Sequence, residues 1–315
     1  MIGITKGVSP EEVRQSGRHV LFVEGGGDNP FDPLVIANLF GGIENIEVKA
    51  LGPSYSLRSV AESLYKHHPS YYFLIDRDHY DDSYIEHCWD SFPNPETSNL
   101  LIWRYREIEN YFLDPVYLMN SRFISDNVDK DILEKDIRQL CQKRLYIDAA
   151  NHVIVSIREE LKQTWIETFS NPEEFVSRKK ALSKLLSADE FNVFKGCVAT
   201  KVDRDGITNR FANILQEMTG GTEGLESGVG KWPMMIRGKK ILPQIVNSKH
   251  FNVRDQKGNP LQGRDKLQQV AKDLLKQPPD IQPEDFRRLR GLIMARLARV
   301  ICSHVMALVC AEFFD

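Results

Sequence analysis

The feature that most constrains the fold is a regular alternation of short apolar runs and helical patterns early in the chain. Apolar runs of strand length lie at 19–23, 46–51 and 71–75, and the segments 30–40 and 56–68 between them have helical spacing. Strand, helix and strand in this order are typical of βαβ units, in which parallel strands pair and helices cover the sheet. The sequence therefore predicts an α/β fold with a mostly parallel sheet flanked by helices.

The composition and the hydrophobic pattern of the chain change after Pro115. Segments 129–145, 152–168 and 172–218 are rich in Leu, Glu, Lys and Arg at helical spacing. A glycine-rich stretch at 219–233 predicts a loop. We therefore expect the second part of the chain to be mostly helical.

Composition excludes several classes of protein. The formal net charge is -3, which argues against a wholly basic nucleic-acid coat. Five scattered cysteines without CxxC spacing indicate neither a disulfide framework nor a zinc site. The apolar stretch 292–314 is interrupted by Arg296, Arg299 and His304, so we expect a buried or interface helix there and no membrane span. No secretory signal pattern opens the chain, and we expect a cytoplasmic protein.

Two of the predicted strands end at acidic residues. Glu24 follows the run 19–23, Asp76 follows the run 71–75, and Asp78 comes two residues later. In parallel sheets, ligands gather at the carboxyl ends of strands, where these acids would meet. Clustered carboxylates raise one another's pKa unless a cation neutralises them, and oxygen ligands suit Mg²⁺ or Mn²⁺. The acids therefore predict a site with one or two divalent ions, suited to phosphodiester hydrolysis.

The same motifs carry a family resemblance. The sequences VEGGGD at 23–28 and DRD at 76–78 resemble the TOPRIM domain of topoisomerases, primases and OLD-family nucleases. The sequences REIENYFLDP at 106–115 and RGKKIL at 237–242 resemble the AriB-type effector nucleases of PARIS antiphage systems. The resemblance implies a Rossmann-like TOPRIM fold with an additional mostly helical domain, and its TOPRIM motifs cover only about residues 19–115.

The resemblance also implies roles for individual residues. Glu24, Asp76 and Asp78 correspond to the metal-binding acids of that fold, and Glu24 is also the candidate general base. Glu109 resembles an additional catalytic acid of the nuclease branch. Lys239 resembles a basic residue that stabilises charge in the transition state. The implied domains are a TOPRIM nuclease domain at 1–125 and a helical domain at 126–315, in which 231–246 can return to the active site.

Each of these assignments competes with a plainer interpretation. Glu107 or Glu109 can pair with Arg104 or Arg106 at the surface, where such pairs contribute little stability. The site lysine can be Lys240 instead of its neighbour, and both can simply face solvent. The candidate phosphate contacts are Arg288 and Arg290 on the terminal helix and Lys179 and Lys180 in the sequence SRKK. Runs of charged residues, however, usually form solvated faces.

The predicted function is that of a magnesium- or manganese-dependent endonuclease. The resemblance implies an ABC-type ATPase subunit that restrains it, host tRNA as the favoured substrate, and a homodimer in the active state. One alternative is a catalytically silent TOPRIM module that binds or senses within an ATPase complex, and another is a DNA nuclease of the OLD type. A topoisomerase or primase lacks support here, because neither a nucleophilic tyrosine nor a zinc module is indicated.

Overall fold

The computed structural model describes residues 19–25, 31–43, 45–64, 67–78, 80–94, 99–162, 171, 173 and 176–312. The chain divides into two compact units. One consists of Met1–Leu140 with Pro233–Asp315, and the other of Cys141–Trp232. Each unit is described by itself.

The first unit is built on a four-stranded, all-parallel sheet. Its strands are β1 (His19–Val23), β2 (Ile46–Ala50), β3 (Tyr71–Ile75) and β4 (Leu100–Ile102), in the order β2-β1-β3-β4. All residues of β1 and β3 are buried, as in sheets covered on both faces, which explains why these strands are continuous apolar runs. The predicted parallel α/β fold is confirmed.

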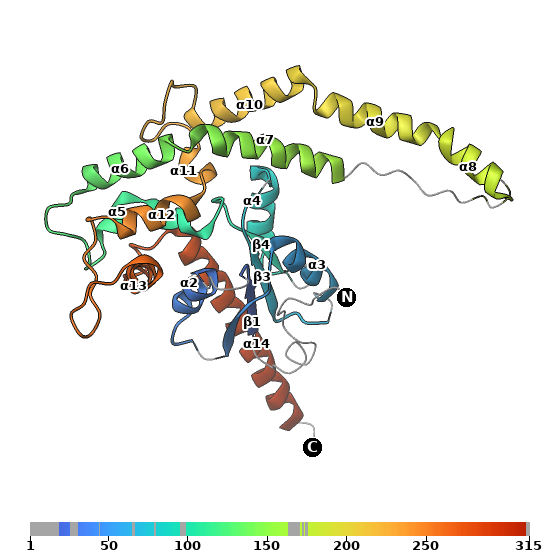
Figure 1. The fold of residues 1–315 in the computed structure, drawn as a ribbon. Helices are drawn as coiled ribbons and strands as arrows, with labels where there is room; N and C mark the ends of the chain where they lie inside the picture. Colours follow the sequence, from blue (N-terminus) through green and yellow to red (C-terminus); the bar gives the residue numbers. More distant parts are fainter. Residues whose placement is uncertain are drawn as a thin grey trace. The chain divides into compact units, whose positions relative to one another are not determined.

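Three helices connect the strands in turn: α2 (Phe31–Leu39), α3 (Ser54–Leu64) and α4 (Asp82–Ser91). In Figure 1, α2 and α3 lie on opposite sides of β1 and β3. Helix α4 begins where the carboxylate of Asp81 accepts a hydrogen bond from the backbone N–H of Tyr84, an N-cap that satisfies an otherwise unpaired donor.

Seven further helices among the described residues belong mainly to this unit, and in the sequence some of them come before the second unit and others after it. They are η1 (Ile108–Leu113), α5 (Pro115–Met119), α6 (Lys130–Gln142), α11 (Trp232–Met235), α12 (Gly238–Asn247), α13 (Gly263–Leu275) and α14 (Glu284–Glu312). Helix α14 is anchored by the fully buried Phe286, whose ring packs against Trp103, Tyr111 and Phe112. Burying a phenylalanine stabilises the fold by roughly 1.5–3 kcal/mol, so α14 belongs to the core of the sheet's unit.

The second unit contains α7 (Leu145–Lys162), α8 (Arg178–Leu186), α9 (Asp189–Lys201) and α10 (Arg204–Thr219). Helix α10 packs along α7, and Glu160 of α7 accepts hydrogen bonds from Lys201 and Arg210. Helix α10 ends at Gly220, which has a left-handed backbone (φ 64°), and the predicted glycine-rich loop follows. Part of the predicted helix at 152–168 lies outside the described residues.

The two units have other bounds than the domains expected from the sequence. The segment 233–315 belongs to the unit that contains the sheet, whereas the sequence predicted that it forms one helical domain with 126–232. The segment 231–246, which was expected to return to the active site, forms α11 and α12. These two helices pack on η1, and Lys239 of α12 contacts Asp76. None of the described helices combines the length and apolar character that a membrane crossing requires.

Candidate functional site

The site lies where the strand order of the sheet reverses. The chain leaves β1 for β2 at one edge, and it leaves β3 for β4 at the opposite edge. Ligands of open parallel sheets bind outside the carboxyl ends of strands at such a switch point. Glu24 follows β1 and Asp76 follows β3, so both acids flank this position.

Glu24 and Asp76 are in direct contact. The Glu24 side chain accepts a hydrogen bond from the backbone N–H of Asp76 at 2.8 Å. Burial raises the pKa of Glu24 to about 7, against the opposing effect of this hydrogen bond, and Asp78 and Asp32 raise it further. The predicted convergence of the two strand-end acids is therefore present in the structure.

Asp76 carries one satisfied and one unsatisfied oxygen. Its side chain is buried, and its Oδ2 accepts a hydrogen bond from Lys239 Nζ at 2.7 Å. Its Oδ1 is buried and has no hydrogen-bond partner among the described residues. Burial raises the pKa of Asp76 well above its ordinary value, and the negative charges of Asp32 and Glu24 add to this effect while Lys239 opposes it.

Glu109 has the same unsatisfied character. It lies in η1, is buried, and its Oε2 has no hydrogen-bond partner in the part of the chain that the structure describes. Burial raises its pKa to about 8, with a further contribution from Asp32. A buried carboxylate oxygen without a partner is energetically costly, so each such oxygen calls for a ligand.

Sequence reasoning missed Asp32. This residue lies in the first turn of α2 and is buried, and burial raises its pKa to about 6. A signal in the sequence could have pointed to it: Asp32 comes five residues after the last of the three glycines, at the start of a predicted helix, where a carboxylate is favoured.

Lys239 reaches the cluster because α12 packs closely on η1. Asn110 of η1 donates to the carbonyl oxygens of Pro233 and Ile236 at 2.8 and 2.7 Å and accepts from the Gly238 N–H at 3.2 Å. A Cβ at Gly238 would lie only 2.5 Å from Asn110 Oδ1, so this approach requires glycine. Burial opposes the charge of Lys239, but the surrounding acids outweigh it and raise its pKa.

Glu107 holds the start of α12. Its carboxylate accepts hydrogen bonds from the backbone N–H of Lys239 at 2.8 Å and from Arg237 Nε at 3.0 Å. It is buried and does not pair with Arg104, which instead binds Glu86 and Asp285. Glu107 is thus a structural carboxylate whose two oxygens both accept hydrogen bonds and which orients Lys239. Glu109 differs from it, because its Oε2 accepts no hydrogen bond from another described residue.

Asp78 occupies a different position from the other predicted ligands. It is exposed, it has a left-handed backbone (φ 45°), and its charge raises the pKa of Glu24. Residues 26–28 of the predicted VEGGGD motif lie outside the described residues. Lys240, the alternative to Lys239, is exposed.

The predicted phosphate contacts come from both units, and each is described within its own unit. Arg288 of α14 binds Asp90 at 2.9 Å, and its guanidinium lies 5.4 Å from the ring centre of Trp89 in α4. Arg290 is partly buried in the same helix. Lys179 and Lys180 are exposed on α8 in the second unit.

The cluster fits a hard divalent cation. Four carboxyl groups of raised pKa surround one lysine, so full ionisation leaves excess negative charge. No three described acids, histidines or cysteines already stand in a ligating arrangement. Mg²⁺ is commonly held by only one or two carboxylates and completes its shell with water and phosphate oxygens, so Asp76 with Glu24 would suffice.

Comparisons of the chain with protein-family models and with curated proteins give no match. Function is therefore inferred from the residues of the site itself.

Proposed function

We propose that this protein is a divalent-cation-dependent nuclease of the TOPRIM type. The observation that carries the proposal is a pair of buried carboxylate oxygens that have no partner among the described residues. They are Asp76 Oδ1, directly after β3, and Glu109 Oε2 in η1. Unpaired buried carboxylate oxygens in a nuclease-like motif are what a hard cation would neutralise.

Asp76 and Glu24 would hold the ion, with water and phosphate oxygens completing its shell, and Glu109 would be the additional acid of the site. Asp78, whose charge acts on Glu24, is the third metal-binding acid that the motif implies. When bound, Mg²⁺ or Mn²⁺ polarises a phosphoryl oxygen and lowers the pKa of a coordinated water. Glu24 is the proposed general base, since a pKa of about 7 suits proton transfer near neutral pH. The backbone N–H of Asp76 fixes its orientation.

Lys239 is the proposed stabiliser of developing negative charge on the phosphate. It stays protonated, it is fixed at the start of α12 by Glu107, and about a third of its side chain (31%) remains exposed to an incoming substrate. A preorganised cation of this kind stabilises a transition state more than a freely rotating surface lysine does.

The substrate and the partner are proposed from the resemblance of the motifs alone. They are host tRNA, cut in the cytoplasm during an antiphage response, and an ABC-type ATPase subunit that restrains the nuclease until infection. The proposed active form is a homodimer.

Cleavage of nucleic acid by the purified protein tests the proposal. Total tRNA and plasmid DNA are incubated with Mg²⁺, with Mn²⁺ and with EDTA, using wild type, Asp76→Asn and the exposed-site control Lys240→Ala. Metal-dependent cutting of tRNA that Asp76→Asn abolishes and Lys240→Ala retains supports the proposal. Cutting of plasmid only would favour a DNA nuclease, and no cutting even with the ATPase subunit and infection extract would favour a silent binding module.

A further inference from the structure

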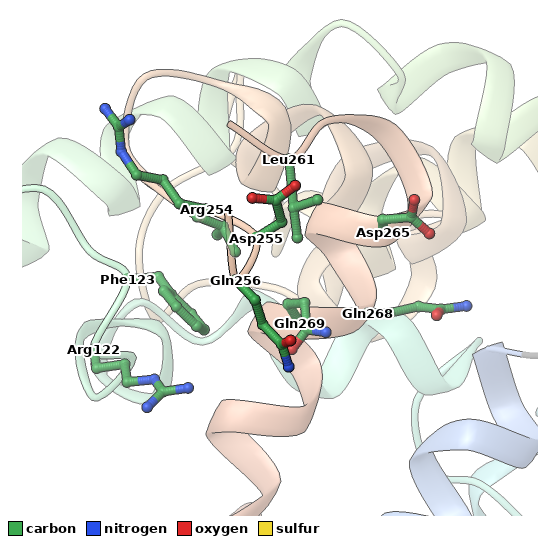
Figure 2. Close-up of a pocket in the computed structure, with 10 residues that line it drawn as sticks. Arg122, Phe123, Arg254, Asp255, Gln256, Leu261, Asp265, Gln268 and Gln269 are labelled. Carbon is green, nitrogen blue, oxygen red and sulfur yellow. The ribbon is translucent and has the colours of Figure 1, made fainter. Parts of the chain in front are cut away.

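A hollow lies in the first unit, and none of the residues of the acid cluster lines it. Its volume is about 460 Å³, within the range of about 300–1,000 Å³ typical of small-ligand sites. It is lined by the loop after α5, by the loop between α12 and α13, and by the first turns of α13. Figure 2 shows Arg122 and Phe123 at the left of the view, and Gln256 and Gln269 near its centre.

The walls of this hollow are held by hydrogen bonds of the backbone. The N–H of Asn252 donates to the carbonyl of Phe123 at 2.8 Å, which joins the two loops. The carboxylate of Asp255 accepts from the N–H groups of Lys257 and Asn259, both at 2.8 Å. This acid is therefore used inside its own turn, and the site is formed before a ligand arrives.

One wall presents flat, stackable groups. The guanidinium of Arg122 lies 4.8 Å from the ring centre of Phe123. Its Nε is held by Asp273 at 3.1 Å, although the side chain is 71% exposed. Unpaired bases are commonly bound by stacking on aromatic rings or on arginine planes, and their stacking is worth about 1–3 kcal/mol per base.

The remaining wall presents unused amides. Gln256, Gln268 and Gln269 line the hollow, and their side chains form no hydrogen bond with another described residue. A glutamine amide offers both a donor and an acceptor, and it matches the N6 and N7 edge of adenine. The exposed Arg254 at the same hollow supplies positive charge for a phosphate.

We propose that this hollow binds an unpaired base of a single-stranded nucleic acid, with adenine the best match. The inference rests on the proposed function and adds to it a substrate-recognition site. Helix α12 links the two places, since it begins at the site lysine and its C-terminal end leads into the pocket loop. A helix of 10 residues is about 15 Å long, a distance that a few nucleotides of single strand can span.

Binding without catalysis tests the inference. Fluorescence anisotropy in EDTA measures the affinity for labelled oligoadenylate RNA, oligouridylate RNA, oligodeoxyadenylate and blunt duplex RNA, with AMP as competitor. The variants are Phe123→Ala, the double variant Gln256→Ala/Gln269→Ala, and Gln216→Ala as an exposed control amide on α10. The double variant removes only exposed amides, so its folding is expected to be intact if Phe123→Ala unfolds.

The expected result is preferential binding of single strands containing adenine, weakened about tenfold by either pocket variant and unchanged by Gln216→Ala. Wild-type affinity in both pocket variants would overturn the inference, as would AMP binding as tightly as the oligonucleotide, which would mean a free-nucleotide site. A parallel Mg²⁺ cleavage assay separates the two proposals. Cleavage with unaltered affinity in the pocket variants contradicts the recognition site alone, and pocket-dependent binding without any cleavage contradicts the nuclease alone.

Discussion

Asp76 and Lys239, which come from the sheet and from α12, form an ion pair of 2.7 Å at the switch point of the sheet. The Asp76 side chain is 6% exposed and the Lys239 side chain is 31% exposed. Because water reaches the lysine but hardly reaches the acid, the charge of Asp76 needs the ion pair more than the charge of Lys239 does. The pair joins two parts of the first unit that are separated in sequence by the whole second unit.

Lys239→Ala is expected to lower nuclease activity by about 10²- to 10³-fold, the usual effect of losing one preorganised group that stabilises transition-state charge. It also leaves Asp76 without its cation. Single-turnover cleavage rates provide the measurement. Lys240→Ala, at the exposed neighbouring position, serves as the matched control. Equal loss in the two variants, or loss only in Lys240→Ala, would show that the wrong lysine has been assigned.

Glu107→Gln and Glu109→Gln are expected to differ in their effect on the free energy of unfolding in EDTA. Glu107 accepts two hydrogen bonds that fix the start of α12, and weakening them is expected to lower the free energy of unfolding by about 1–3 kcal/mol. Glu109→Gln removes a buried carboxylate whose Oε2 has no partner among the described side chains and backbone, and it is expected to leave stability unchanged or higher at alkaline pH. Urea denaturation measures both. Destabilisation by Glu109→Gln equal to that of Glu107→Gln would contradict the distinction drawn between the two acids.

Without a divalent ion, the protein is expected to lose stability as pH rises toward about 8. The folded-state pKa values of Glu24, Asp32 and Glu109 are raised to about 7, 6 and 8. In that window the folded state binds more protons than the unfolded state, so stability falls with increasing pH. Mg²⁺ competes with these protons and should stabilise the fold more at high pH than at low pH. Thermal melts across this range, with Mg²⁺ and with EDTA, measure the effect, and a pH-independent Mg²⁺ shift would count against it.

Gly238→Ala is expected to destabilise the protein by about 1–3 kcal/mol, because the added methyl would lie 2.7 Å from the backbone N of Asn110. Activity should fall with it, since the same contact positions Lys239. Gly291→Ala in α14 is the control: nothing lies within 4 Å of its added Cβ, and alanine is favoured there by helix propensity. If both substitutions stabilise the protein, the close packing of η1 on α12 is incorrect.

The strand-end acids could be predicted because they depend on local patterns. The runs that became β1 and β3 are continuous and apolar, and parallel strands bring Glu24 and Asp76 to the same edge. The role of Glu107 could not be predicted in this way. It arises from contact between η1 and α12, and no spacing in the sequence reports an interaction across an intervening unit.

The sequence also could not show which of the helices after residue 126 pack in the unit of the sheet. Helical periodicity shows that α12 and α14 have apolar faces, but it does not show which partner those faces bury. The decisive contacts, such as Phe286 against Trp103 and Tyr111, are between side chains that are distant in sequence. Asp32 was missed because one acid at a helix start is common and is explained by helix electrostatics alone.

The most direct test of the central claim is a calorimetric titration of the purified protein with Mn²⁺ at alkaline pH, where the cluster acids are ionised. We predict saturable binding that Asp76→Asn abolishes and Lys240→Ala leaves unchanged. Absence of Mn²⁺ binding to the wild type, or equal binding to Asp76→Asn, would contradict the assignment of the acid cluster as a metal centre.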